Sequence, residues 1–271
     1  MINLTILLII IFYSIIQSIT EWLPISSTAH LIIVSKFLPN VLDKNFFSLF
    51  MVVIQLASIL AMVTVYKDKL FFKNNVEFKE KKNLYLKIVL SSIPCVIVGL
   101  LMNNIIEKFQ DNILIIVISL LVIGIVFLFI DKIIKVKKDR NISYKDSFII
   151  GLFQIFAMVF PGVSRSGITL IGGLLLGYKK EESTSFSFMM SIPVMCGATV
   201  LQIIKYHSVL NEDNIILLFI GCIFSYFMSL GVIKWLLRYL KNHSYFIFGI
   251  YRIILGVIVY LVTFIFWQNL R

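Results

Sequence analysis

Charged residues are scarce in this chain of 271 residues: Asp, Glu, Lys and Arg make up 14% of it, whereas hydrophobic residues make up 59%. Soluble domains average about half apolar and a quarter charged residues. The deficit therefore excludes an ordinary soluble domain and predicts an integral membrane protein. Too little polar sequence remains between the apolar runs for a separate soluble unit, so we expect one membrane domain over residues 1–271.

Cysteine and the common catalytic motifs are rare or absent. Cys95, Cys196 and Cys222 fall in apolar runs and show no pairing by spacing, which predicts packing residues rather than disulfides or a metal site. The sequence contains no Walker A loop, no HExxH motif and no cluster of His and Cys at metal-ligand spacing. The function must therefore be sought in other residues.

Long hydrophobic runs are abundant. Runs near 20 residues recur at about 46–66, 86–106, 113–131, 185–204, 214–233 and 246–267. Each run is long enough to cross ~30 Å of hydrocarbon as a helix. The pattern predicts an all-α polytopic membrane protein with six full spans.

The net charge of +11 is distributed unevenly along the chain. Eighteen basic residues fall in four connections, at 67–87, 132–145, 179–180 and 234–241, and only five fall in the alternate connections and at the C-terminus. The side richer in Lys and Arg is expected to be cytoplasmic, which places both termini outside. This alternation also explains the basic charge without a nucleic-acid partner, and we expect none.

The chain repeats itself. Residues 14–30, SIIQSITEWLPISSTAH, align with residues 151–167, GLFQIFAMVFPGVSRSG, at an offset of 137, and two glycine pairs follow at an offset of 132. The matched pairs are Gln17 with Gln154, Pro24 with Pro161, Ser27 with Ser164, Gly99 with Gly231 and Gly124 with Gly256. We therefore expect repeat one over about 1–135 and repeat two over about 143–271. Each repeat has one polar segment and three spans. Because three is odd, the second repeat begins on the opposite side of the membrane from the first, so the repeats should have inverted topology.

The polar segments are predicted to be re-entrant helical hairpins. Only about 14 residues separate Asp146 from Pro161, which is ~21 Å of helix and too short to cross, and residues 166–177 then return. Residues 2–20 could span alone, but the repeat favours a hairpin there too. Broken helices at membrane depth must be buried in protein or line a wet cavity, so we expect the two tips to meet.

The first polar segment carries groups that are costly in a membrane and usually functional. Gln17 and Glu21 lie four residues apart on one helix face, and Pro24 then breaks the helix. The next helix begins with three hydroxyls and a histidine, namely Ser26, Ser27, Thr28 and His30. The free N–H groups and the dipole of that helix start favour an anion.

The second polar segment, PGVSRSGIT at 161–169, supplies another helix start. It carries Ser164, Arg165, Ser166 and Thr169. Arginine offers a planar fork that suits phosphate or carboxylate. Two helix starts, an arginine and several hydroxyls indicate an anion site, and phosphate fits the number of donors best.

Structural roles for the same residues also stay open. Ser26 and Thr28 could simply cap a helix, Glu21 and Arg165 could form a structural ion pair, and His30 could be a satisfied core histidine. A carboxylate and a histidine beside an anion site nevertheless favour a reaction site over simple binding.

Both segments resemble the signatures of a known family. QSITEWLPISSTAH resembles the pattern (E/Q)-x-x-x-E-(F/W)-L-P-(V/I)-S-S-T-(G/A)-H of bacterial undecaprenyl-pyrophosphate phosphatases associated with bacitracin resistance. PGVSRSGIT resembles their pattern P-G-x-S-R-S-G-x-T. The motifs have the family's order and spacing, and length and hydropathy match over essentially all 271 residues.

The resemblance implies a plasma-membrane enzyme that removes the terminal phosphate of undecaprenyl pyrophosphate and so recycles the lipid carrier of envelope polymers. It implies functional roles for Gln17, Glu21, Ser27, His30, Ser164, Arg165 and Thr169. It also implies a divalent cation, Mg²⁺ or Ca²⁺, whose ligands the sequence does not identify. The chain differs from many members of the family at Gln17, where Glu is common, and at Ser185, where we expect an acidic residue. A neutral amide is a poorer ligand for a hard metal.

Two mechanisms stay open. We favour attack by Ser27, activated by His30, with Glu21 orienting His30 or acting as acid and base, and with Arg165 neutralising phosphoryl oxygens. Alternatively, His30 or Glu21 activates water and Ser27 only binds phosphate. The remaining polar residues are expected to bind substrate, namely Gln17, Ser26, Thr28, Ser164, Ser166 and Thr169.

A lipid-phosphate flippase or anion transporter would need a similar anion site. Glu21 and His30 favour hydrolysis, because transport needs no nucleophile and base. Arg252, within the last apolar run, either pairs with a carbonyl or marks the cavity, and the sequence does not decide between these. The oligomeric state also stays open, a homodimer included.

Overall fold

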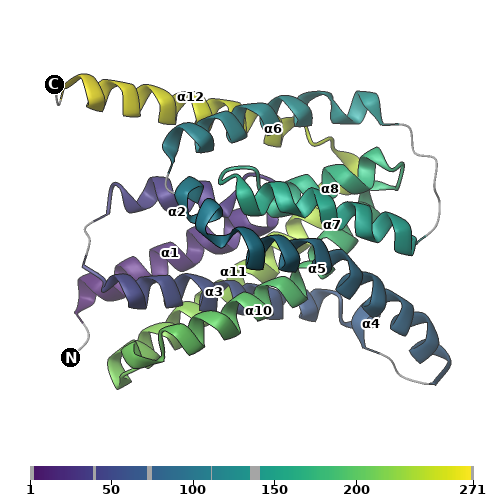
Figure 1. Cartoon of the computed structure of the whole chain (residues 1–271), viewed down its shortest axis with the longest axis horizontal. Helices are drawn as coiled ribbons and strands as arrows, with labels where there is room; N and C mark the ends of the chain where they lie inside the picture. The colour runs from purple at the N-terminus through teal and green to yellow at the C-terminus, as the bar shows by residue number, and fades with distance from the viewer. Residues whose placement is uncertain (1–2, 39–40, 72–74, 111, 135–140, 270–271) are drawn as a thin grey trace.

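The computed structural model describes residues 3–38, 41–71, 75–110, 112–134 and 141–269. This part of the chain is helical and contains no strand, which confirms the predicted all-α class (Figure 1). The helices are α1 Leu4–Trp22, α2 Ser27–Ser35, α3 Lys44–Val65, α4 Lys67–Leu70, α5 Asn75–Gln110, α6 Ile113–Ile133, α7 Tyr144–Val159, α8 Arg165–Leu175, α9 Lys180–Met189, α10 Ser191–Lys205, α11 Glu212–Asn242 and α12 Phe246–Asn269.

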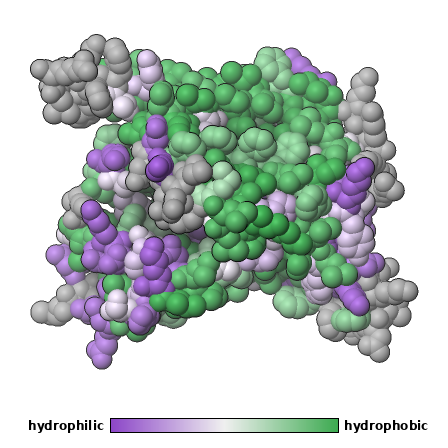
Figure 2. Space-filling view, viewed as in Figure 1, coloured by the Kyte–Doolittle hydropathy of each residue, from purple (hydrophilic) through white to green (hydrophobic). Residues whose placement is uncertain are grey.

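Seven stretches of helix in the described residues are long and apolar enough to span a membrane. They are α1, α3, Lys81–Met102 within α5, α6, Lys180–Lys205 over α9 and α10, α11 and Phe246–Thr263 within α12. Six of them overlap the six predicted spans, and α1 is the seventh. Large apolar side chains are exposed on their outer surface, such as Leu101 at 79% and Phe219 at 66%. Figure 2 shows this surface as a wide apolar zone between polar patches at the two edges. The protein is therefore a multi-pass membrane protein.

The helices do not follow the apolar runs residue for residue. The run at 185–204 is broken at Met190 between α9 and α10. Pro193 explains the break, because proline cannot donate a helical hydrogen bond and its ring clashes with the carbonyl four residues earlier. Helix α11 continues to Asn242, nine residues beyond the predicted end at 233, because lysines and arginines on a solvated face do not stop a helix. Part of the predicted basic connection, residues 135–140, lies outside the described residues.

Two helical breaks give the chain its hairpins. Helix α1 turns at residues 23–26 into α2, and α7 turns at residues 160–164 into α8. Ser26 and Ser164 are the N-caps of α2 and α8, each with a positive φ, 75° and 71°. Each accepts a hydrogen bond from the N–H three residues on. This geometry pairs Ser164 with Ser26, so the alignment of Ser164 with Ser27 was wrong by one residue, because the second turn is one residue longer.

Helices of each half of the chain pack on helices of the other half. Helix α1 packs on α11 of the second half, whereas α7 packs on α5 of the first, and α6 packs on its counterpart α12. Glycines allow α6 and α12 to approach each other closely. A Cβ at Gly124 would lie 2.8 Å from Ile253 Cγ1, and one at Gly256 would lie 3.2 Å from Leu121 Cδ2. The start of α1 and the end of α12 lie at one edge in Figure 1. An inverted repeat requires such reciprocal packing. Three points stay predictions: the inversion itself, the entry of the hairpins into the membrane and the side on which the termini lie.

Candidate active site

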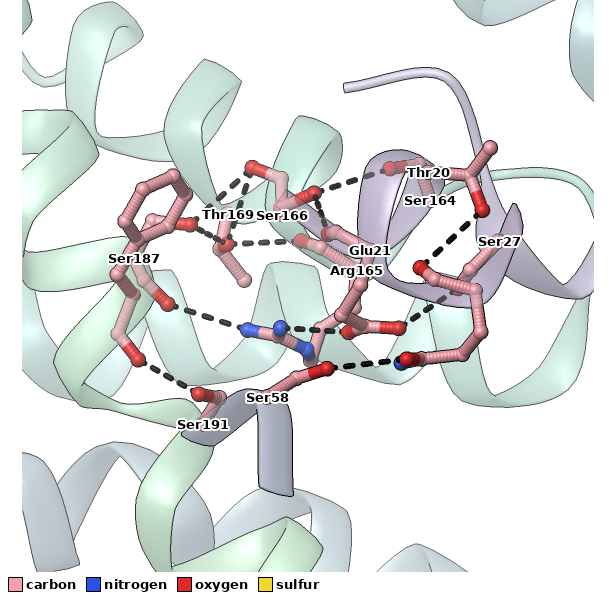
Figure 3. A network of polar contacts seen from close by, with 12 residues as sticks. Thr20, Glu21, Ser27, Ser58, Ser164, Arg165, Ser166, Thr169, Ser187 and Ser191 are labelled. Carbon is pink, nitrogen blue, oxygen red and sulfur yellow. Dashed lines mark hydrogen bonds and ion pairs between the residues drawn. The ribbon is translucent and has the colours of Figure 1, made fainter. Parts of the chain in front are cut away.

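A carboxylate joins the two hairpin breaks. Glu21, near the end of α1, is 5% exposed. Its Oε1 lies 2.9 Å from Arg165 Nη2, and its Oε2 accepts a hydrogen bond of 2.7 Å from the Ser27 hydroxyl (Figure 3). The structure thus brings together a hydroxyl at the start of α2, a guanidinium at the start of α8 and the acid between them.

Helix α9 supports Arg165 from the other side. Arg165 Nη1 donates to the Ser187 carbonyl at 3.2 Å, and the Ser187 hydroxyl lies 2.6 Å from Thr169 Oγ1 (Figure 3). Ser166 Oγ donates to the Glu21 carbonyl at 3.1 Å. Ser166 therefore links the two hairpins, whereas Thr169 links α8 to α9. Arg165 Nε is buried and has no partner among the described residues.

The side chains of Glu21, Ser27 and Arg165 line a cavity of about 350 Å³. Six residues singled out in the sequence line it: Glu21, Ser26, Ser27, Thr28, Ser164 and Arg165. The other polar groups around it are Gln55, Cys95 and Gln154, and the remaining wall is apolar, formed by Ile106, Ala157, Met158, Gly162, Val194, Met195 and Ala198. The other four predicted site residues, Gln17, His30, Ser166 and Thr169, do not line it. The cavity therefore has a polar end at the hairpin breaks and an apolar wall from α5, α7 and α10.

Two helix starts face this polar end. Helix α2 begins at Ser27 and α8 at Arg165, and the first N–H groups of a helix have no intrahelical partner. Their donors and dipoles favour a negative charge. The caps Ser26 and Ser164 hold a sparsely populated backbone conformation with positive φ, which costs a non-glycine residue about 1–3 kcal/mol. Such strain collects at ligand sites, where the surrounding fold enforces it.

His30 points to a different partner from the expected one. Its Nδ1 lies 2.7 Å from the Ser26 carbonyl and must donate to it. In the neutral ring Nε2, 2.7 Å from Tyr251 Oη, then accepts the tyrosine hydroxyl. The two rings stack with centroids 5.6 Å apart. Neither ring nitrogen bonds Ser27 or Glu21 among the described contacts, so the expected relay from Ser27 to His30 is not formed. Tyr251 was missed because it lies 221 residues from His30 and only packing brings α12 to α2.

Gln17 belongs to a separate polar cluster. It is fully buried, and its Oε1 accepts hydrogen bonds from Ser58 at 3.0 Å and Ser225 at 3.1 Å. Ser18 bonds Ser225 as well. These contacts tie α1 to α3 and α11. The repeat counterpart Gln154 lines the cavity instead, and its match with Gln17 is the one feature of the sequence that pointed to it.

Arg252 connects both hairpin turns. The fully buried side chain donates to the carbonyls of Pro24 at 3.0 Å, Gly162 at 2.6 Å and Val163 at 3.3 Å. It also donates to the Ser119 carbonyl of α6 at 3.3 Å. Arg252 thus pairs with carbonyls, does not line the cavity, and fixes the two turns to each other.

Ser185 occupies the position where we expected an acid. Its hydroxyl accepts a hydrogen bond of 3.0 Å from Lys69 Nζ, which also lies 4.0 Å from Glu182 Oε2. Glu182, one turn earlier on α9, therefore supplies the countercharge for Lys69.

The described residues do not form a metal site of their own. No group of three or more His, Cys, Asp or Glu side chains in the described part of the chain could hold an ion. Glu21 is the one acidic residue described in the cavity lining, and both of its oxygens are engaged. A hard cation would need further oxygen ligands from elsewhere.

Comparison with known proteins gives one consistent result. The sequence model of the family described as bacitracin resistance protein BacA matches residues 10–258. The undecaprenyl-diphosphatase of Desulfitobacterium hafniense is 40% identical over 260 residues, which cover 93% of this chain and 94% of that protein. Undecaprenyl-diphosphatase 1 of Clostridium acetobutylicum is 41% identical over 261 residues, covering 92% and 95%. The undecaprenyl-diphosphatase of Enterococcus faecalis strain V583 is 40% identical over 260 residues, covering 92% and 94%.

Proposed function

The chain belongs to the family of the bacitracin resistance protein BacA, and from this premise we propose that it hydrolyses undecaprenyl pyrophosphate to undecaprenyl phosphate and inorganic phosphate. The observation that carries the proposal is the Ser27 hydroxyl held at 2.7 Å by Glu21, which is itself paired with Arg165 at 2.9 Å. A nucleophile, a base and a cationic phosphate ligand thus meet at two helix starts in one cavity.

The cavity suits both ends of this substrate. The pyrophosphate carries several negative oxygens, which match the N–H groups at the starts of α2 and α8 and the Arg165 guanidinium. The apolar wall, which includes Ile106, Val194 and Met195, suits the first prenyl units. The lipid tail would continue between helices into the surrounding hydrocarbon.

The geometry favours Ser27 as nucleophile with Glu21 as its base. Ser27 Oγ attacks the terminal phosphorus while its proton passes to Glu21 Oε2, and the bridging P–O bond breaks to release undecaprenyl phosphate. Water then attacks the phosphoserine, releases phosphate and restores the serine. Glu21 replaces His30 as the proposed base, because Glu21 contacts the hydroxyl and His30 contacts Tyr251. Arg165 stabilises the negative oxygens of the transferring phosphoryl group.

A divalent cation, Mg²⁺ or Ca²⁺, remains part of the proposal. With a single acidic residue described in the cavity lining, the cation would be held chiefly by the pyrophosphate oxygens, and bound there it would neutralise their charge. The enzyme would act in the bacterial plasma membrane with both termini outside, as an inverted repeat with re-entrant hairpins. Hydrolysis there would return the lipid carrier for envelope synthesis.

The experiment is phosphate release from undecaprenyl pyrophosphate by the detergent-purified protein. Detergent micelles have no two leaflets, so a flippase or transporter would leave the substrate intact, whereas the proposed enzyme releases one phosphate per molecule. Glu21→Gln is the matched control, because it keeps the shape of the side chain and removes the base. Intact substrate in the wild-type reaction would refute the proposal.

A further inference from the structure

Gln154 is a buried polar side chain beside the Cys95 thiol, which is a weak hydrogen-bonding group. It lies on α7 and is 2% exposed, and both its amide nitrogen and its amide oxygen lack a hydrogen-bond partner among the described residues. Burying an amide without hydrogen bonds costs free energy, and native proteins rarely leave both of its polar atoms unpaired. Because Gln154 lines the cavity, a ligand there could supply the missing bonds.

A second unpaired group lies in the same place. Arg165 Nε is buried without a partner among the described residues, and Arg165 also lines the cavity. The Cys95 thiol, which also lines the cavity, lies beside the Gln154 side chain and within electrostatic range of Arg165. Arg165 Nε and the Gln154 amide are therefore unsatisfied polar groups of two residues that line one cavity.

The repeat counterpart makes the contrast clear. Gln17 has the same side chain in the equivalent arm of the first hairpin. Its Oε1 accepts bonds from Ser58 and Ser225, and only its Nε2 has no partner among the described residues. The amide oxygen at this position of the fold can therefore be satisfied by protein hydroxyls. Gln154 is not satisfied in this way, and it is the one of the pair that lines the cavity.

We propose that Gln154 is a specificity-determining residue that binds the terminal phosphoryl group of the pyrophosphate. This assignment rests on the proposed function. The amide N–H donates to a phosphoryl oxygen, and Oε1 accepts the proton of a phosphoryl hydroxyl, which a phosphate monoanion carries. A side chain that donates and accepts recognises a partly protonated phosphoryl group without adding another charge beside Glu21 and Arg165.

The test measures binding of inorganic pyrophosphate by calorimetry to the detergent-purified chain in magnesium-containing buffer, together with thermal unfolding. Gln154→Met keeps the length of the side chain and removes its hydrogen bonds. Loss of a bond to a charged group should raise the Kd about tenfold or more, while the unfolding midpoint stays equal or rises because an unpaired amide is gone. Gln154→Glu should raise the Kd further, because a carboxylate repels the phosphoryl oxygens.

Gln202→Met is the matched control. Gln202 on α10 also has a buried amide oxygen with no partner among the described residues, but it does not line the cavity. Its substitution should leave the Kd unchanged. An unchanged Kd in Gln154→Met, with or without a lower unfolding midpoint, would overturn the assignment and leave Gln154 a structural or water-bonded residue. Failure of the wild-type chain to bind pyrophosphate would overturn it too.

The binding measurement separates this inference from the proposed function. If the wild-type chain binds pyrophosphate through Gln154 but leaves undecaprenyl pyrophosphate intact, the hydrolytic function fails and the phosphoryl site stands. If hydrolysis occurs and Gln154→Met binds pyrophosphate normally, the function stands and the Gln154 assignment fails.

Discussion

Replacing Arg252 tests whether the two hairpin turns are positioned together. The side chain is fully buried and donates to Pro24 at 3.0 Å and to Gly162 at 2.6 Å, with two longer bonds of 3.3 Å to Val163 and Ser119. Arg252→Met fills similar space and removes all four bonds. The carbonyls of both turns would then face an apolar side chain.

The expected magnitude follows from the two shorter bonds. A hydrogen bond from a charged donor contributes about 1.5–3 kcal/mol, but removing a buried charge also relieves a desolvation cost of several kcal/mol. We therefore expect a net loss of about 2–4 kcal/mol in the free energy of unfolding. The turns carry Ser27 and Arg165 at their ends, and a misplacement of 1 Å can lower the rate about 100-fold. The kcat of the folded variant should fall by about that factor.

The assay compares kcat for phosphate release at saturating substrate with unfolding in mixed micelles of increasing SDS content. Arg252→Lys keeps the charge but has no planar fork, so it should restore part of the stability and little of kcat. Arg238→Met, at an exposed position of α11, controls for loss of an arginine. A stable Arg252→Met variant with kcat within threefold of the wild type would refute the positioning role.

Three further outcomes are expected. Arg165→Lys should lose at least about 100-fold in kcat, because a point charge cannot replace the fork that bonds Glu21 and Ser187; near-normal turnover would make Arg165 structural. Chelator should stop turnover, yet calorimetry should detect no tight Mg²⁺ binding before pyrophosphate is added; tight binding to the free protein would contradict a cation held by the substrate. Single cysteines at Lys67 and Asn211, in a background without the three native cysteines, should be labelled from opposite sides of the membrane of intact cells. Labelling of both from outside would contradict the inverted-repeat topology.

Much of the fold could be predicted because membrane helices are specified by local composition. Apolar length gave six spans, and Pro24 and the Pro161–Gly162 pair marked both hairpin turns. The break at Met190 was also readable in principle, since Pro193 lies four residues after the last residue of α9. Reading hydropathy alone concealed it, because the apolar run continues across the break.

The contacts between distant helices could not be predicted in this way. Glu21, Ser27 and Arg165 were expected together because each lies at a helix end in a repeated segment. The partner of His30 depends on which face of α12 meets α2, and Tyr251 gives no local sign of it. Likewise, Gln17 and Gln154 look equivalent in the sequence. Serines from α3 and α11 surround Gln17, whereas the cavity lies beside Gln154.

The most direct test of the central claim is the kcat of Ser27→Ala at saturating undecaprenyl pyrophosphate. If Ser27 attacks phosphorus with Glu21 as its base, the variant should bind pyrophosphate with nearly normal affinity and release no phosphate above background. His30→Ala, whose ring bonds Tyr251, should retain measurable turnover in the same assay. Substantial turnover by Ser27→Ala would contradict the account, since it would mean that water attacks and that the serine only binds phosphate.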